Sequence, residues 1–230
     1  MYINAYTHPD LRHIPADKGW VFSNQTNSGF AELTCADIHA LKNRFPILLD
    51  PHSALTLPVV PLEADIESEP LDGYVPCKWE QYPFEIADTQ VQTDNPSDSL
   101  DDAGSTLWVD TTSRQFNQFS GYRLFTDNGE PTRYLQRKIE VAQTVRHQIA
   151  DIRELVGLIH QANLLSSITL LHQGRLYVMA RIDPRALSSH SNWLEDQPGG
   201  LRALLLADYL LESQSHLTEY DGIWVNSDSG

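Results

Sequence analysis

The sequence predicts an α+β fold in which short, mostly antiparallel strands pack around one long helix, with a hairpin and a helix at the C-terminus. Short apolar runs bounded by proline and glycine fill the first half of the chain, as expected of short strands. One apolar stripe with helical spacing then runs from Thr132 to Ala162. Two further β-type runs flank a glycine-containing turn. We expect residues 1–230 to form a single domain.

The first elements are short. Strands or extended segments are predicted at Trp20–Ser23, Phe30–Leu33, Pro46–Leu49 and Leu55–Pro61. Between them, Thr34 is a suitable N-cap for a helix over Cys35–Lys42, with Asp37 at its third position. Further strands are predicted at Gly73–Lys78, Thr106–Asp110 and Tyr122–Thr126, before a turn at Asp127-Asn128-Gly129.

The clearest element is a helix from about Thr132 to Ala162. Pro131 suits its start, because the N–H that proline lacks has no partner in a first turn. Apolar residues recur every three or four positions, and we expect these five to be buried: Leu135, Ile139, Ile149, Ile152 and Val156. Two interpretations remain, a core helix and one limb of a coiled-coil homodimer. The wide apolar face favours the core helix.

In the C-terminal third of the chain, the sequence pattern predicts a hairpin and a helix. The hairpin pairs Ser167–Leu171 with Leu176–Arg181. Asp183-Pro184 then begins a short helical turn through Leu187. A final helix follows Pro198-Gly199-Gly200, and Ile223–Val225 is a short strand candidate.

Acidic residues outnumber basic ones, 31 to 16, which gives a net charge of −15. This balance argues against nucleic acid and anionic membranes as partners, because both attract basic surfaces. Thirteen acidic residues and one basic residue, Lys78, lie between Glu63 and Asp110. Residues 88–104 predict a mobile acidic surface loop, since the ligand register of a calcium loop is absent. With no secretory signal or membrane-spanning run in the sequence, we expect a cytoplasmic location.

The sequence contains no recognisable catalytic motif, so no catalytic residue and no cofactor is assigned. His8 and Asp10 have the H-x-D form of an iron site, which also needs a distant histidine. An exposed pair is the simpler interpretation, and a metal site is the alternative. Cys35 and Cys77 are interpreted as reduced thiols.

Aromatic residues concentrate between Gly73 and Glu85, among two prolines. The candidate binding residues there are Tyr74, Trp79, Tyr82 and Phe84. Proline stiffens the backbone, and aromatic rings bury large areas at low entropic cost. The segment is therefore either a turn that fills the core or a platform for a ligand or peptide.

This segment, with its YVP and YPF sequences, resembles the SapC family of bacterial proteins. Three further stretches agree in order: Arg44–Ile47, Leu124–Gln136 and Leu176–Leu211. The resemblance covers most of residues 30–215. Glu80 and Gln81 stand where family members often carry arginines, so an anion-binding role is not expected here.

The resemblance implies an accessory role, because many members are encoded beside flavin-dependent halogenase-like enzymes and outer-membrane receptors. We therefore expect a non-catalytic protein that binds a peptide, a small metabolite or a partner enzyme, and a cationic partner would suit the acidic segment. The alternatives are a metal-dependent oxygenase using His8 and Asp10, and a surface-layer-associated protein, since the family was named for a surface-layer gene.

Overall fold

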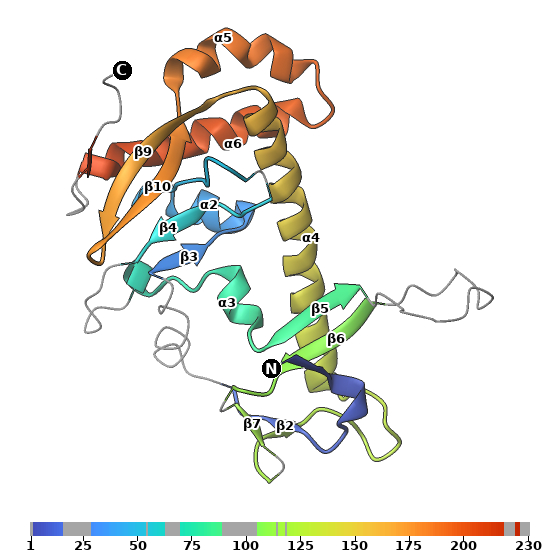
Figure 1. The fold of residues 1–230 in the computed structure, drawn as a ribbon. Coiled ribbons are helices and arrows are strands. Elements are labelled where there is room, and N and C mark those ends of the chain that lie inside the picture. The colour runs from blue at the N-terminus through green and yellow to red at the C-terminus, as the bar shows by residue number, and fades with distance from the viewer. Residues whose placement is uncertain are drawn as a thin grey trace, which may run out of the picture. The chain divides into compact units, whose positions relative to one another are not determined.

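The computed structural model describes residues 2–15, 29–53, 55–62, 70–88, 105–113, 115–117, 119–218 and 224–225 (Figure 1). It confirms the α+β class, with small antiparallel sheets and one long helix. Contacts divide the chain into two compact units. Unit 1 holds residues 1–17 and 81–146, and unit 2 holds residues 18–80 and 147–230. The single domain over residues 1–230 stays a prediction, and residues 89–104 of the acidic loop lie outside the described residues.

Unit 1 is built on two three-stranded sheets. In the first, β6 (Ser105–Asp110) lies between β1 (Tyr2–Asn4) and β5 (Phe84–Asp88). In the second, β2 (Arg12–His13) lies between β7 (Phe116–Asn117) and β8 (Tyr122–Arg123). The short helix η1 (Ala5–Thr7) and the first part of α4 (Arg133–Gln161) complete the unit. Its core contains Phe84, Ile86, Leu107, Val109, Leu124, Phe125, Leu135 and Ala142.

Unit 2 combines a strand pair, a hairpin and most of the helices. β3 (Phe30–Glu32) pairs with β4 (Val59–Pro61), and β9 (Leu165–His172) lies between β10 (Arg175–Ile182) and β11 (Trp224–Val225). The helices are α2 (Cys35–Leu41), η3 (Pro70–Gly73), α3 (Cys77–Gln81), the rest of α4, α5 (Pro184–Glu195), α6 (Gly200–Ser213) and η4 (Gln214–Thr218). A large core joins α2, α4 and α6, with Ile38, Ile152, Ile159 and Leu210 at most 1% exposed.

Local sequence explains where several elements begin and turn. Thr34 and Asp37 form the capping box at the start of α2, and the Asp183 carboxylate accepts the Arg185 N–H at the start of α5. The hairpin turns at Gln173 and Gly174, both with positive φ, as a two-residue turn between antiparallel strands requires. At these three positions, the local sequence alone predicts the observed helix start or turn.

The long helix is the prediction that the structure reproduces most closely, since α4 spans Arg133–Gln161. The hairpin and the last helix are also confirmed. The strand expected at Gly73–Lys78 is wrong, because Pro70–Gly73 and Cys77–Gln81 form short helices there. The strand β5 was not predicted, and α5 extends well beyond the expected turn.

Two smaller expectations need revision, and others are not tested. Ile139 and Ile149 are only partly buried, whereas Leu135, Ile152 and Val156 are at most 1% exposed. The segment Trp20–Ser23 lies outside the described residues. The homodimer through the long helix stays a prediction. Among the described residues, no helix is both long enough and apolar enough to cross a membrane.

Candidate functional site

The four aromatic residues singled out from the sequence do not share one setting. Tyr74 and Trp79 belong to unit 2, whereas Tyr82 and Phe84 belong to unit 1. Trp79 is 5% exposed and Phe84 is 1% exposed, so both fill cores. Tyr74 and Tyr82 are half-buried, and their hydroxyls donate to Asp37 and Asp110 at 2.9 and 3.0 Å. The binding role of these residues stays a prediction, and Tyr74 and Tyr82 are the two with exposed surface.

Asp37 explains why Tyr74 lies where it does. Its carboxylate is fully buried and accepts hydrogen bonds from the Thr34 N–H and hydroxyl at 2.8 Å, and from the Tyr74 hydroxyl and Cys77 N–H at 2.9 Å. Burial and the Asp37 charge raise the pKa of Cys77 to about 11. The thiol is therefore protonated at neutral pH, and this cluster anchors α2 to the segment that begins α3.

The alternative metal pair, His8 and Asp10, lies on the surface of unit 1. Both side chains are exposed, and the His8 Nδ1 lies 2.8 Å from the Thr7 hydroxyl. Within the ranges that the structure describes, no three His, Cys, Asp or Glu side chains come together as a metal site would need. The third ligand that this hypothesis needs is not supplied by any described residue.

A histidine that carried no sequence motif, His13 on β2, occupies the centre of unit 1. It is 1% exposed, and its Nδ1 lies 2.5 Å from the Tyr134 hydroxyl on α4. The ring meets Phe84 edge to face at 4.9 Å between centroids, and Phe116 at 5.3 Å. Phe84, one of the four candidate binding residues, therefore packs against the buried ring of His13. Tyr134 lies on α4, Phe84 on β5 and Phe116 on β7, so only the tertiary structure reveals this setting, because the three partners are distant from His13 in sequence.

The second ring nitrogen of His13, Nε2, is buried, and no described residue lies within hydrogen-bonding geometry of it. Burial lowers the pKa of His13 from 6.5 to about 4, and the charge of Lys138 acts in the same direction, while the Gln115 side chain opposes both. Burial also raises the pKa of Tyr134 to about 12, so its hydroxyl keeps its proton. The pair is therefore neutral at pH 7, and it holds the Tyr134 ring in place.

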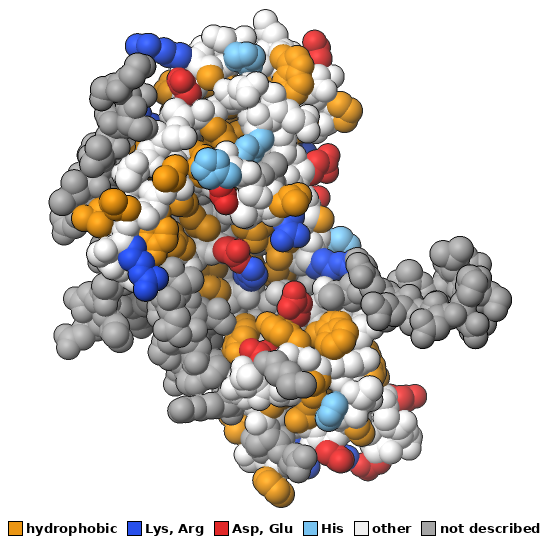
Figure 2. Space-filling view, viewed as in Figure 1, with side chains coloured by type: hydrophobic (Ala, Val, Ile, Leu, Met, Phe, Trp, Pro, Cys, Tyr) orange, Lys and Arg blue, Asp and Glu red, His pale blue; other side chains and the backbone are white. Residues whose placement is uncertain are grey.

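Tyr134 in turn supports an exposed aromatic residue. Its ring stacks on that of Tyr122 at 4.5 Å between centroids and 9° between planes, and Tyr122 is 57% exposed. Phe119 is 91% exposed and Ile14 is 41% exposed on the same β2–β8 region. We call Ile14, Phe119 and Tyr122 the aromatic surface of unit 1. Figure 2 shows apolar side chains exposed on the part of the molecule that holds β2 and β7.

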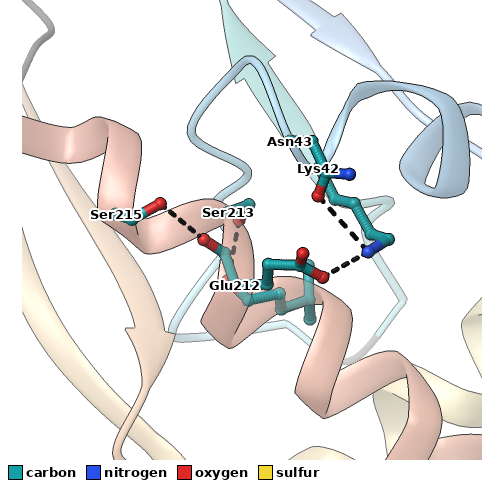
Figure 3. Close-up of polar contacts among 6 residues, drawn as sticks. Lys42, Asn43, Glu212, Ser213 and Ser215 are labelled. Atoms are coloured by element: carbon teal, nitrogen blue, oxygen red, sulfur yellow. Dashed lines mark hydrogen bonds and ion pairs between the residues drawn. The ribbon is translucent and has the colours of Figure 1, made fainter.

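A second polar cluster of unit 2 surrounds Lys42, at the end of α2. Its Nζ forms an ion pair with Glu212 of α6 and donates to the Asn43 side chain at 3.3 Å (Figure 3). It also lies 4.6 Å from the Tyr209 ring centroid. Ser213, fully buried, accepts the Ile47 N–H at 3.2 Å beside it. These contacts join the end of α2 to α6.

The fold is thus that of an α+β protein with two compact units, each with short strands and a share of α4. The chain belongs to the SapC family, whose model matches residues 3–175. The match includes the N-terminal segment, where the motifs gave no resemblance, and stops before the resemblance noted at Leu176–Leu211. No curated protein and no solved structure shows significant similarity.

Proposed function

We propose that this SapC-family protein is a non-catalytic binding or accessory protein that engages a protein or peptide partner through the aromatic surface of unit 1. The observation that carries the proposal is the exposed Tyr122 ring, stacked on Tyr134 above the buried His13. A partner enzyme such as a halogenase-like neighbour is the expected class of ligand, and the cytoplasm is the proposed location.

The physical reason is preorganisation. A tyrosine that is already stacked loses little side-chain freedom when a partner covers it, so most of its buried area contributes to affinity. Exposed aromatic residues are also enriched among the residues that dominate binding energy. Phe119 and Ile14 are also exposed, Phe119 three residues before Tyr122 and Ile14 next to its strand partner His13, so they add apolar surface to the same region of unit 1.

The proposal is tested by binding of purified protein to the halogenase-like enzymes and receptor domains that are encoded beside family members. The double variant Phe119→Ser/Tyr122→Ser should weaken binding at least tenfold, with an unchanged melting temperature. Trp193→Ser is the matched control, because Trp193 is also an exposed aromatic residue, 40% exposed, and lies on α5 of unit 2. Equal affinity of the double variant and the wild type would contradict the proposal, as would an equal loss in the control.

A further inference from the structure

Among the described residues, nothing pairs with the outer edge of β10 at two positions near the hairpin turn, Leu176 and Val178. Ala180 exchanges two backbone hydrogen bonds with Leu49, at 2.8 and 3.0 Å, on the side of β10 that faces away from β9. Backbone groups alternate in direction along an antiparallel strand, so Val178 and Leu176 point the same way as Ala180. Their outward N–H and C=O groups have no hydrogen-bond partner among the described residues.

The chain itself stops the pairing at this point. Continued in the same register, Leu49 opposite Ala180 would place Pro51 opposite Val178. Proline has no N–H to donate, and the Asp50 carboxylate accepts the His52 N–H at 2.7 Å, which turns the backbone. The described segment that pairs with Ala180 therefore does not continue along β10, because of its own residues Asp50 and Pro51.

The side chains along this edge change from buried to exposed. Ala180 and Ile182 are fully buried, whereas Val178 is 54% exposed and Leu176 is 71% exposed on the same face of the strand. The apolar stripe thus continues past the part of the sheet that the rest of unit 2 covers. Figure 2 shows apolar side chains exposed on the part of the molecule where Figure 1 places the turn of the β9–β10 hairpin.

We propose that an extended segment of a partner protein adds to the edge of β10 beside Leu176 and Val178. Open backbone groups select an extended chain, and two exposed apolar residues on one face select apolar side chains at alternate positions. On the opposite face, Arg175 is exposed and forms no ion pair with any described residue, so an acidic side chain suits that side of the added strand. The site lies within unit 2 and does not depend on the aromatic surface of unit 1.

A second copy of this chain fits the edge less well. A two-fold pairing that used both Leu176 and Val178 would place Gly174 of each copy opposite Ala180 of the other. Leu49 already occupies that position. The occupant is therefore a foreign strand that ends, or turns away, before Ala180.

The test uses a displayed library of eight-residue peptides with apolar residues at alternate positions, selected on the full-length protein. Affinity of the selected peptides is measured by fluorescence polarisation. We expect Leu176→Lys and Val178→Lys to weaken binding at least tenfold, because they place a charge beside the apolar side chains of the added strand. Leu201→Lys is the matched control, since Leu201 is 70% exposed on α6. We expect it to leave affinity unchanged.

N-methylation of the peptide separates strand addition from simple apolar contact. Methylating the amides along one edge of the bound peptide should abolish binding, whereas methylating the alternate amides should be tolerated. Peptide binding should also slow hydrogen exchange at the Leu176 and Val178 amides. Failure to select any alternating peptide, equal loss in the Leu201→Lys control, tolerance of both methylation patterns, or a dimer abolished by Val178→Lys would each overturn the proposal.

Discussion

Acidification should destabilise unit 1 through His13. The pKa of the buried ring is about 4, compared with 6.5 for a solvated histidine, so the unfolded chain binds a proton that the folded chain does not. Stability is therefore fully present above pH 6.5 and falls as the pH drops from 6.5 towards 4. The difference between the two pKa values corresponds to about 3 kcal/mol of unfolding free energy. About 2 kcal/mol of this stabilisation is lost between pH 7.5 and pH 5.

The measurement is hydrogen exchange and urea unfolding at a series of pH values. Amides of β6, which lies in the core of unit 1, report on that unit. His13→Gln removes the titrating group, so the variant should be less stable than wild type at pH 7.5 but should lose about 2 kcal/mol less between pH 7.5 and pH 5. His147→Gln, at an exposed position of α4, is the control and should follow the wild-type profile.

The structural cause can be distinguished from a general effect of acid. His172 is also buried, and its pKa is lowered by burial, so the wild type contains a second contribution of the same sign in unit 2. Comparing wild type with His13→Gln isolates the contribution of His13, because His172 is present in both proteins. Identical pH profiles for wild type and His13→Gln would refute the reasoning and place the ring of His13 in water.

Three further predictions concern stability, each measured by urea unfolding. Ile152→Asp should cost more than about 4 kcal/mol, because Ile152 is fully buried, whereas Ile149→Asp at a half-buried position should cost clearly less; equal costs would contradict the core assignment. Asp37→Asn should cost about 3 kcal/mol, since two of four donors would then face an amide NH₂, and a neutral result would argue against the hydrogen-bond cluster. Gly200→Ala should destabilise the protein, because the new Cβ would lie 1.6 Å from the Leu194 carbonyl oxygen. Gly157→Ala in α4 should stabilise it by up to about 1 kcal/mol, because alanine favours a helix and the added Cβ meets no atom within 4 Å. A Gly200→Ala variant more stable than Gly157→Ala would refute both expectations.

The aromatic segment shows how tertiary context changes a sequence-based interpretation. Tyr74, Trp79, Tyr82 and Phe84 are close in sequence, which favoured a single platform. The structure instead assigns them to two units and buries two of them. Helical segments replace the expected strand, so neighbouring aromatic residues point into different surroundings.

Local signals were sufficient where one physical requirement dominates. The stripe of α4, the capping box at Thr34 and Asp37, and the turn at Gln173 and Gly174 follow from helical periodicity, from unpaired N–H groups at a helix start, and from the positive φ of a tight hairpin. The motifs at Gly73–Ala87 likewise led to the family that the comparison shows. These features depend on residues a few positions apart.

The sequence by itself therefore determined the α+β class, the long helix, the hairpin and the SapC family. Only the tertiary structure decided that His13 is buried beside Tyr134 and that Tyr122 is an exposed ring stacked on Tyr134. It also decided that no described segment pairs with the outer edge of β10 at Leu176 and Val178. The first two features join residues that are far apart in the chain. The third depends on which segments pack against β10. Their desolvation and hydrogen bonding are set by which distant segments meet, and local propensity does not carry that information.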